Sequence, residues 1–393
     1  MPAGLRSSRV AVRRRRAVVL ALAVAALIAG AVVGAGGDSP NGSAPARGPG
    51  AAAPSTLAQA RADVARMPLQ RQVGELLIVA FSGTRAPRYV LDALHDGRAA
   101  GVILFGGNAP SAASVRALTA QLRHASRAGG MPPPIICLDQ EGGEIRTLRF
   151  APSGVGQAGQ RTPAAARAAA AATAHALRRV GVNVVLGPVA DVAGGREESV
   201  MASRAYPGGA PAVAASTRAA VRAYLHAGVL PVVKHFPGLG GARTNTDDAP
   251  APIDRTRAQL TADLAPFRAA IAAGGPLVML GHASYPALDP NRIASQSQAI
   301  ASELLRGTLG FHGVTMTDSL EAEAALATTG HDVGATAVRS LMAGADLLLM
   351  TGPGSFPLVR DAVSAAARRS PAVRARVAAA AARILRQWRA PTE

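Results

Sequence analysis

Apolar and polar positions alternate in blocks along most of this chain. Eight short apolar runs rich in β-branched residues occur at 74–83, 100–108, 133–143, 182–192, 229–238, 276–286, 313–320 and 345–354. Longer segments rich in Ala, Arg and Leu separate most of them, and those at 111–129 and 211–228 have helical spacing. Continuous apolar strands that alternate with helices are typical of a parallel sheet covered by helices. Eight such units predict an α/β fold, a (β/α)8 barrel of the TIM type in a single domain.

An open, doubly wound sheet is the alternative architecture. Such a sheet usually carries a Gly-rich phosphate-binding loop after its first strand. The first apolar run is instead followed by "AFSGTRAP" (80–87), which is no such loop, and the GxxxxGK[ST] motif does not occur in the chain. The barrel is therefore the prediction.

Polar residues gather where the predicted strands end. They are Asp139, Gln140 and Glu141 in the third run, Asp191 in the fourth, Lys234 and His235 in the fifth, His282 in the sixth and Asp318 in the seventh. In a (β/α)8 barrel the functional site lies at the carboxyl ends of the strands. Any one of these residues alone could be a helix cap or a satisfied buried polar group. Their position at the same end of successive strands predicts one shared site.

The N-terminal segment has the pattern of a targeting signal. Four arginines at 13–16 precede about 20 apolar and small residues at 17–36, which is typical of a signal peptide or an uncleaved signal anchor. A segment rich in Ser, Pro, Gly and Ala follows to residue 55 and predicts a flexible linker. We therefore expect a signal at 1–36, a linker at 37–55 and a barrel with a C-terminal helix at 56–393. The protein would be exported, either anchored in the membrane by the N-terminal segment or secreted.

The formal net charge of +18 raises the question of a nucleic-acid partner. Six arginines lie within the first 16 residues, and the rest are scattered through Ala-rich segments, as is typical of solvated helix surfaces. No aromatic residues are interleaved with these arginines, and the chain lacks the Cys and His spacing of a zinc finger. We therefore expect no nucleic-acid partner. The one cysteine, Cys137, lies in an apolar run and is expected in the core. The eight histidines lack HxxxH or HxH spacing, so we expect no metal and no cofactor.

Five motifs occur together in one order along the chain. They are "DQEGG" (139–143), "GPVADV" (187–192), "SRAYPG" (203–208), "KHFPG" (234–238) and "TDSLEAEA" (317–324). In sequence and order they resemble the barrel domain of glycoside hydrolase family 3 over about residues 70–360. The branch that they resemble most is the single-domain β-N-acetylhexosaminidases that act on cell-wall sugars. The resemblance implies a retaining glycosidase whose substrate is a carbohydrate.

The resemblance also implies roles for single residues. Asp318 corresponds to the aspartate that attacks the anomeric carbon, and it must stay ionised to do so. Lys234 or His235 would help as a nearby cation, and both would donate to sugar hydroxyls. Asp139 would bind hydroxyls at the non-reducing end of the sugar, and Arg204 would be a further substrate contact.

Two further residues carried over from the family have open roles. Asp191 either binds the sugar or holds Arg204 in place. His282 either contacts the substrate or makes a structural hydrogen bond near the floor of the pocket.

Lys234 is the only lysine among the 42 Lys and Arg residues. A compact ammonium group can donate to two or three hydroxyls in a small pocket, whereas a planar guanidinium suits carboxylates and phosphates. A small sugar pocket would therefore explain why Arg has not replaced this lysine. The alternative is that one lysine survived by chance.

The loop after "KHFPG" departs from the family pattern. The related enzymes have a His-Gly there, followed by an Asp-Ser-His in which the histidine is the acid/base catalyst. Here Leu239 replaces the first histidine, and in this register Asn245 stands for the aspartate and Asp247 for the catalytic histidine. We hypothesise that Asp247 is the acid/base, that Asp248 raises its pKa, and that the glycines of "GLGG" let the loop close.

Two alternatives to Asp247 remain open. The loop has lost its catalyst, or the acid is another residue, such as Glu321, Glu141 or Glu197. A helix-start role is the structural alternative for Glu321.

The expected activity is removal of a terminal β-linked N-acetylhexosamine, most simply N-acetylglucosamine, during turnover of cell-wall peptidoglycan or related glycans. Aromatic residues make up only 3% of the chain, which favours a small pocket for one terminal sugar over a long polysaccharide groove. One alternative is a catalytically silent sugar-binding protein of the envelope. Another is a β-glucosidase-type hydrolase of the same family, but those enzymes usually carry a second domain, and only about 40 residues follow the eighth run.

Overall fold

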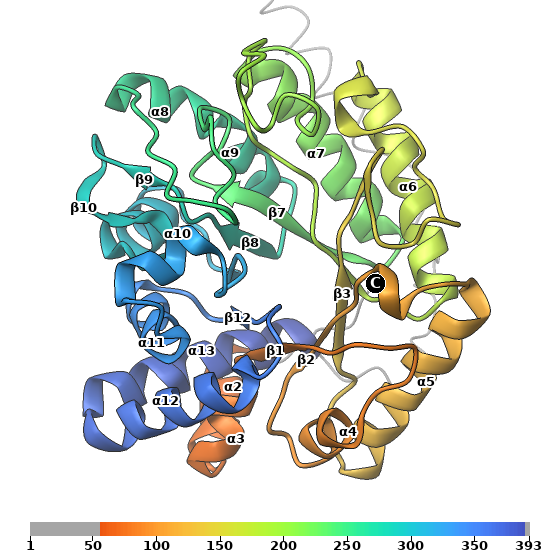
Figure 1. Ribbon diagram of the computed structural model, residues 1–393, viewed down its shortest axis with the longest axis vertical. Helices are drawn as coiled ribbons and strands as arrows, with labels where there is room; N and C mark the ends of the chain where they lie inside the picture. Colours follow the sequence, from red (N-terminus) through yellow and green to blue (C-terminus); the bar gives the residue numbers. More distant parts are fainter. Residues whose placement is uncertain (1–55, 390–393) are drawn as a thin grey trace, which may run out of the picture. The chain divides into compact units, whose positions relative to one another are not determined.

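A computed structural model of the chain describes residues 56–389, which form a barrel of eight parallel strands inside a layer of helices (Figure 1). The expected signal and linker, residues 1–55, lie outside the described residues. The strands are β1 (Leu77–Ala80), β2 (Gly101–Ile103), β3 (Ile135–Leu138), β6 (Val184–Val185), β7 (Leu230–Phe236), β8 (Leu277–Leu280), β11 (Val314–Thr317) and β12 (Leu348–Leu349). Each lies within one of the eight predicted apolar runs, and the predicted (β/α)8 barrel is confirmed.

The strands neighbour one another in the order β11–β8–β7–β6–β3–β2–β1–β12. A parallel bridge between Met316 and Leu347 brings the two ends of this sheet together. The amide of Leu347 donates to the carbonyl of Thr315 at 2.8 Å, and the amide of Thr317 donates to the carbonyl of Leu347 at 3.0 Å. Because all eight strands are parallel, their carboxyl ends meet at one end of the barrel.

Two hairpins extend from the strand ends. β4 (Gln140–Gly142) pairs with β5 (Ile145–Arg146) after β3, and β9 (Ser284–Tyr285) pairs with β10 (Asp289–Ile293) after β8. Both pairs are antiparallel. The first hairpin contains part of the "DQEGG" motif, so it carries that motif out of the barrel toward the expected site.

Helices follow the strands and cover the barrel (Figure 1). They are α4 (Arg88–His95), α5 (Ala112–Ala128), α6 (Pro163–Arg179), α7 (Ala210–His226), α8 (Arg257–Asp263), α9 (Ala265–Ala272), the π-helix η4 (Ala299–Thr308), α10 (Glu323–Leu326), α11 (Val333–Ala343), α12 (Ser355–Arg369) and α13 (Pro371–Arg389). Two more, α2 (Leu57–Ala65) and α3 (Leu69–Gly74), precede β1 and pack against α13. Short 3-10 turns lie at η1 (Gly106–Asn108), η2 (Gln157–Gly159), η3 (Ala294–Gln296) and η5 (Ala327–Thr329).

Local sequence signals mark the starts of several helices. The hydroxyl of Ser111 accepts from the amide of Ser114 at the start of α5. Thr162 caps α6 in the same way, and Pro163 occupies its first turn, where no helical N–H is needed. These helices therefore begin where the sequence supplies a side-chain partner for an otherwise unpaired amide.

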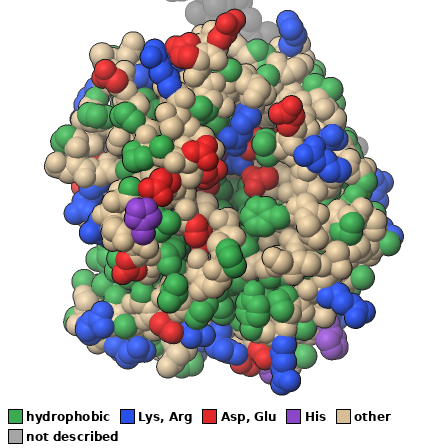
Figure 2. Space-filling view, in the orientation of Figure 1, with side chains coloured by type: hydrophobic (Ala, Val, Ile, Leu, Met, Phe, Trp, Pro, Cys, Tyr) green, Lys and Arg blue, Asp and Glu red, His purple; other side chains and the backbone are tan. Residues whose placement is uncertain are grey.

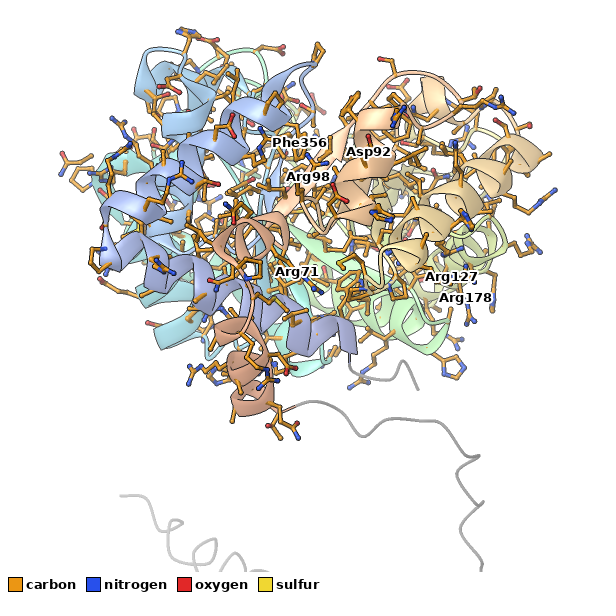
Figure 3. The ribbon with its side chains drawn as sticks, turned by 90° about the horizontal axis from the view of Figure 1, so that it is seen from below. Arg71, Asp92, Arg98, Arg127, Arg178 and Phe356 are labelled. Atoms are coloured by element: carbon orange, nitrogen blue, oxygen red, sulfur yellow. The ribbon has the colours of Figure 1, made fainter. Side chains whose placement is uncertain are left out.

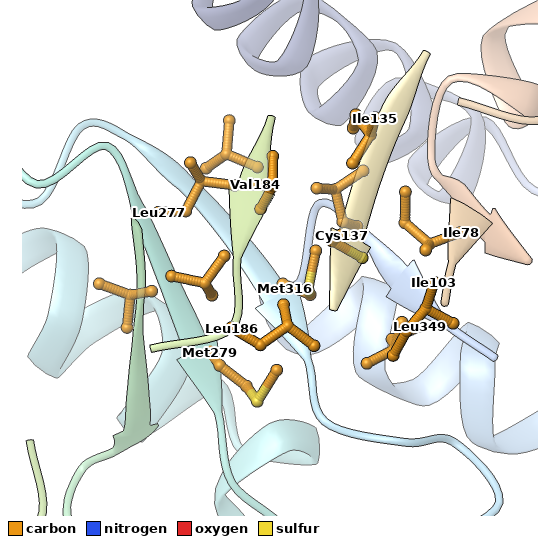
Figure 4. Close-up of a cluster of buried hydrophobic side chains, with 14 of the residues drawn as sticks. Ile78, Ile103, Ile135, Cys137, Val184, Leu186, Leu277, Met279, Met316 and Leu349 are labelled. Carbon is orange, nitrogen blue, oxygen red and sulfur yellow. The ribbon is translucent and has the colours of Figure 1, made fainter. Parts of the chain in front are cut away.

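The core lies inside the barrel and between the strands and helices. Figure 4 shows a cluster of its buried side chains, including Ile103, Met279 and Leu349 from three strands. Cys137 belongs to this cluster, and burial raises the pKa of its thiol, so the thiol stays protonated. Cys137 is thus the small core residue that the sequence predicts.

Many arginines lie on the helical layer. Figure 3 shows Arg127 and Arg178 on the outside of α5 and α6, where both are exposed. Among residues 56–389, every helix is too short or too polar to span a lipid bilayer.

Candidate active site

A cavity opens at the carboxyl ends of the strands, where the sequence concentrates its polar residues. Its volume is about 290 Å³, and its lining includes Asp139, Lys234, Asp247, Asp318 and Glu321. Figure 2 shows acidic side chains around a hollow in the middle of this face. Four carboxylates thus surround one ammonium group, a set of residues suited to acid/base chemistry.

A larger cavity, of about 610 Å³, lies on the outer side of the loop that follows β7. Its lining includes Arg196, Arg243 and Arg255, and it shares no lining residue with the smaller cavity. Because the smaller cavity lies at the carboxyl ends of the strands and is lined by the polar residues that the sequence places there, we assign the chemistry to it. We call it the catalytic cavity.

Lys234, near the end of β7, lies in a buried network of charges. Its ammonium contacts Asp139 Oδ1 at 2.5 Å and Glu141 Oε1 at 2.7 Å. The guanidinium of Arg204 binds both carboxylate oxygens of Glu141, with Nη2 2.6 Å from Oε1 and Nε 2.9 Å from Oε2. The side chain of Lys234 is only 4% exposed, so its charge requires these partners.

The network keeps its members charged. Burial alone would raise the pKa of Glu141, but the charge of Lys234 and the hydrogen bond from Arg204 outweigh it and lower that pKa to about 2. Burial likewise opposes the charged form of Lys234, yet Asp139 and Glu141 raise its pKa above the usual value. Glu141 is therefore a permanent anion and a poor general acid, which removes it from the alternative acids.

Asp191 lies behind His235 and does not line the catalytic cavity. Its Oδ2 is 2.7 Å from His235 Nδ1, and its Oδ1 accepts from the amides of His235 at 3.2 Å and Leu239 at 2.6 Å. Asp191 is fully buried, and Glu141, not Asp191, holds Arg204. The expected sugar contact of Asp191 is therefore corrected: it orients His235 and the start of the following loop, and it acts on Arg204 only through its charge, beside Glu141.

Asp318 immediately follows β11 and faces His235. Its Oδ2 is 3.9 Å from His235 Nε2, and its Oδ1 accepts from the amide of Ser319 at 2.8 Å. Burial alone would raise the pKa of Asp318, but His235, His282 and Lys234 outweigh it and lower that pKa. Asp318 therefore stays ionised in the cavity, as a nucleophilic carboxylate must.

His282 is buried below the cavity and has both ring nitrogens occupied. Nδ1 lies 2.7 Å from Ser295 Oγ, and Nε2 lies 2.8 Å from the carbonyl of Ser319. Because that carbonyl can only accept, Nε2 carries the proton. His282 does not line the cavity, so of the two roles left open by the sequence the structure supports the structural hydrogen bond, beside Asp318.

The loop after β7 brings Asp247 to the cavity. The backbone carbonyls of Thr246 and Asp247 accept from the amides of Ala324 and Glu323, each at 3.1 Å, at the start of α10. Asn245 Oδ1 accepts from the amide of Asp247 at 3.3 Å, and Asn245 Nδ2 lies 3.5 Å from Asp247 Oδ2. The loop thus spans from β7 to α10 and holds Asp247 beside Asn245, the register read from the sequence.

Asp247 and Asp318 have opposite electrostatic environments. Asp247 is exposed as a whole residue, but partial burial of its carboxyl group, followed by the charge of Asp318, raises its pKa, while a hydrogen bond from Asn245 opposes the shift. Asp248, the cause expected from the sequence, is not among the main causes of this shift, and the charge that raises the pKa most is that of Asp318. One carboxyl group is thus biased toward the protonated form and the other toward the ionised form.

One glycine of the loop, Gly240, has a packing role, while the expected closing of the loop stays a prediction. A Cβ at Gly240 would lie 2.1 Å from the carbonyl oxygen of Val192. Because this oxygen belongs to the backbone, movement of a side chain could not relieve the clash. Leu239 is buried and bonded to Asp191. Gly240 therefore lets the loop pack directly on the segment that follows β6.

Glu321 is the remaining alternative acid in the cavity. Its Oε2 accepts from the amide of Thr351 at 2.9 Å and from Ser319 Oγ at 3.2 Å, whereas its buried Oε1 has no partner. α10 begins at Glu323 with Ala322 as its cap, so the helix-start role for Glu321 was wrong. Glu197, the third alternative, is exposed and lies outside the cavity lining.

Sequence reasoning missed Glu141 as the shared partner of Lys234 and Arg204. A signal was present, because Asp139 and Glu141 are two residues apart in an extended segment and so face the same side. No pattern in the sequence predicted that Ser319 and Thr351 contact Glu321. Among residues 56–389, no group of three or more His, Cys, Asp or Glu side chains is arranged to hold a metal ion.

Similarity to known proteins agrees with this geometry. The family model described as "Glycosyl hydrolase family 3 N terminal domain" matches residues 68–387. A β-hexosaminidase of Xanthomonas oryzae pv. oryzae is 35% identical over 292 residues, covering 71% of this chain and 84% of the relative.

Two solved structures are similar over most of the chain. A glycoside hydrolase family 3 β-N-acetylglucosaminidase from a Paenibacillus species superposes with a TM-score of 0.76 at 32% identity, covering 82% of this chain and 63% of the other. A β-N-acetylhexosaminidase from Beutenbergia cavernae gives a TM-score of 0.75 at 32% identity, covering 82% of this chain and 99% of the other.

Proposed function

We propose that this chain, which belongs to glycosyl hydrolase family 3 and is a glycosidase, removes a terminal β-linked N-acetylhexosamine from glycans by a retaining mechanism. The β-hexosaminidase and β-N-acetylglucosaminidase names of its relatives support the choice of sugar. The observation that carries the mechanism is the pairing of Asp318, whose pKa is lowered, with Asp247, whose pKa is raised, in one cavity. Two carboxyl groups with opposed environments can divide the roles of nucleophile and acid.

In the first step, a carboxylate oxygen of Asp318 forms a bond to the anomeric carbon while the glycosidic C–O bond breaks. Asp247 donates its proton to the departing oxygen, so the leaving group departs as a neutral alcohol. The product is a covalent sugar ester of Asp318 and an ionised Asp247. His235, held by Asp191, faces Asp318 and limits the directions from which it attacks.

In the second step, Asp247 acts as a base. Its carboxylate takes a proton from a water molecule, whose oxygen attacks the anomeric carbon and displaces Asp318. Asp247 is reprotonated and Asp318 is released as an anion, so both groups return to their starting states. Two successive inversions at the anomeric carbon retain its configuration.

The charged network positions the sugar. Asp139 has a partly exposed carboxylate and Lys234 lines the cavity, so both can bond to hydroxyls of the terminal sugar. Glu141 and Arg204 fix the ammonium of Lys234 from behind. This arrangement supports recognition of the non-reducing end of a glycan, and hence exo action.

We also propose that the protein is exported and meets its substrate in the cell wall. The basic patch at 13–16 and the apolar segment at 17–36 support export. A peptidoglycan-type glycan, which carries terminal amino sugars, is the substrate class that an exported enzyme of this kind would encounter.

The first test is hydrolysis of an aryl N-acetyl-β-glucosaminide by the purified protein and two variants, with an aryl β-glucoside in parallel. Asp318→Asn should abolish turnover, because no covalent ester can form. Asp247→Asn should lower kcat about 100-fold or more even on this aryl substrate, because Asp247 also serves as the base that activates water in the second step. Asp248→Asn is the matched control, and it should retain native activity.

Each other result has a definite meaning. Full activity of Asp247→Asn would exclude Asp247 and transfer the acid role to Glu321, the other candidate in the cavity. Preference for the glucoside would replace the hexosaminidase by a β-glucosidase. Binding of N-acetylglucosamine without turnover of either substrate would identify a catalytically silent sugar-binding protein.

A further inference from the structure

We infer that the larger cavity, on the outer side of the loop that follows β7, binds an anionic group of the carboxylate or phosphate type. Its volume is about 610 Å³, and its lining includes Arg196, Arg243 and Arg255. We call it the arginine cavity. The inference goes beyond the proposed function, because the arginine cavity shares no lining residue with the catalytic cavity and takes no part in the proposed reaction.

Two segments of the chain build the arginine cavity. Arg196 belongs to the segment after β6, whereas Arg243 and Arg255 belong to the segment between β7 and α8. Thr244 and Gln259 add neutral polar side chains to the lining. A guanidinium matches the geometry of carboxylate and phosphate oxygens, so three arginines around one cavity are suited to an anion of this type.

Arg196 is half-buried and lacks a carboxylate partner. Its Nε donates to the carbonyl of Gly240 at 3.3 Å, and its Nη2 donates to the carbonyl of Val192 at 2.5 Å. Among residues 56–389, no carboxylate lies within ion-pair distance of this guanidinium, and its Nη1 has no hydrogen-bond partner. The charge of Arg196 therefore remains available to an anion.

Arg255 also has donors that its neighbours do not use. Its side chain is 17% exposed, and its Nη1 lies 3.1 Å from Asp263 Oδ2. Within the described part of the chain, neither its buried Nε nor its Nη2 has a hydrogen-bond partner. Buried donors in folded proteins are nearly always paired, so Arg255 is only partly satisfied by the protein itself.

Arg196 and Arg255 act on each other as like charges. Burial lowers the pKa of Arg196, and the charge of Arg255 lowers it further, while Asp263 and Glu198 oppose the shift. An anion that binds beside both guanidinium groups would offset this repulsion, because each group then gains an attractive partner.

Two carboxylates also line the arginine cavity, Glu198 and Asp254, and both residues are exposed. Glu198 lies 3.8 Å from Arg243, whose side chain is exposed as well, so this pair is weak. Three arginines against two carboxylates leave the lining with a positive charge. An anion should therefore bind with its negative charge on the side of Arg196, away from the exposed carboxylates.

Arg196 connects the arginine cavity with the loop that carries Asp247. The carbonyls that it binds belong to Gly240 and Val192, which pack on each other at the start of this loop. Asp247 lies further along the same loop and lines the catalytic cavity. An anion that offsets the charge of Arg196 would stabilise the loop in this position, and with it the fold.

The test is the thermal midpoint of unfolding of the purified protein in sodium phosphate, in sodium acetate and in sodium chloride, at equal pH and ionic strength. A ligand that binds only the folded state raises the midpoint as its concentration grows. We expect such a rise in phosphate or in acetate beyond that in chloride, and the more effective anion identifies the bound group as a phosphate or a carboxylate. Arg196→Gln should weaken the apparent affinity about tenfold or more, because it removes a charged hydrogen-bond donor.

Arg257→Gln is the matched control. It removes the same charge from an exposed arginine two positions beyond Arg255 and outside the cavity lining, and it should keep the native response. Phosphate also stabilises proteins without binding, through exclusion from their surface. A response that survives in Arg196→Gln, or that Arg257→Gln reduces equally, would therefore overturn the inference, as would equal midpoints of the native protein in all three salts.

A second variant covers the case in which Arg196→Gln does not fold. Arg243→Gln changes an exposed side chain of the same cavity and should weaken the apparent affinity about threefold, the effect of one exposed charge. A full native response in this variant would then overturn the inference. The midpoint does not depend on turnover, so the result holds whether or not the proposed glycosidase activity is found.

Discussion

At the residue scale, Lys234 is the only lysine of the chain, and its ammonium lies between the carboxylates of Asp139 and Glu141, at 2.5 and 2.7 Å. A guanidinium also suits carboxylates, so these partners do not by themselves explain the lysine. The small sugar pocket therefore stays the prediction for why Arg has not replaced it. Arg204 also binds Glu141, through Nε and Nη2, each of which donates to one carboxylate oxygen.

The pKa shifts of the two carboxyl groups proposed as catalytic, Asp318 and Asp247, predict a pH profile. Activity should rise with pH as Asp318 ionises, below the usual range for an aspartate, because its pKa is lowered. Activity should fall with pH as Asp247 loses its proton, above the usual range for an aspartate, because its pKa is raised. The dependence of kcat/KM on pH should therefore be bell-shaped, with an acidic optimum.

Asp247→Asn separates the two limbs of this profile. An amide cannot titrate, so the alkaline limb should disappear from the residual activity on an activated aryl substrate, while the acidic limb remains. Asn245→Ala is a milder companion: its amide opposes the rise in the pKa of Asp247, so the alkaline limb should move to higher pH. An alkaline limb that survives in Asp247→Asn would assign it to another group.

At the element scale, the loop after β7 is fixed at both ends by backbone contacts. Leu239 donates to Asp191 at its start, and Thr246 and Asp247 accept from the start of α10 at its end. Between these anchors, Gly240 packs against the carbonyl of Val192. The position of Asp247 therefore depends on the fit of this loop against two other segments of the barrel.

Gly240→Ala should shift the loop and reduce catalysis. The added methyl group would meet the Val192 carbonyl at 2.1 Å, so the backbone must move, and a misplaced acid should lower kcat about tenfold or more. Gly241→Ala is the control, because a methyl group there would meet only side-chain atoms of Ile253 and Arg255, at 3.1 Å and beyond. The measurement is kcat beside the thermal midpoint, and equal losses in both variants would exclude a specific role for Gly240.

At the scale of the whole molecule, a second charged cluster joins the C-terminal helix to the barrel, near the start of β12. Asp346 is fully buried and contacts Arg306 at 2.6 Å, Arg376 at 2.9 Å and Arg383 at 3.1 Å. Arg306 lies in η4, and the other two lie in α13. One carboxylate thus holds two helices against the strands, at the end of the barrel away from the catalytic cavity.

Asp346→Asn should destabilise the fold by about 3 kcal/mol or more, because it leaves buried guanidinium groups without a counter-charge. Unfolding in urea measures this loss, and Asp361→Asn, which breaks an exposed pair with Arg360, should change the free energy of unfolding by less than about 1 kcal/mol. The arginines also lower the pKa of Asp346, with burial opposing them. This contribution to stability is present above the unfolded pKa and is lost as the pH falls through the folded pKa. A variant as stable as the native protein would contradict the role of the cluster.

The sequence by itself determined the barrel and most of the residues around its mouth. Eight apolar runs and the helical segments between them predict the strands, because strand and helix periodicities are local properties of the chain. Asp139, Lys234 and Asp318 could be placed in one cavity because the carboxyl ends of parallel strands must meet at one end of a barrel, whereas Asp247 was placed there by the register of its loop against the family pattern.

Only the tertiary structure decided what each of these residues contacts. Asp191 proved to orient His235, His282 proved to be buried and satisfied, and Asp318 replaced Asp248 as the charge that raises the pKa of Asp247. Glu141 emerged as the anion between Lys234 and Arg204. The physical reason is that burial, ion pairing and pKa depend on distances between segments far apart in the chain, whereas the pattern of apolar positions depends only on near neighbours.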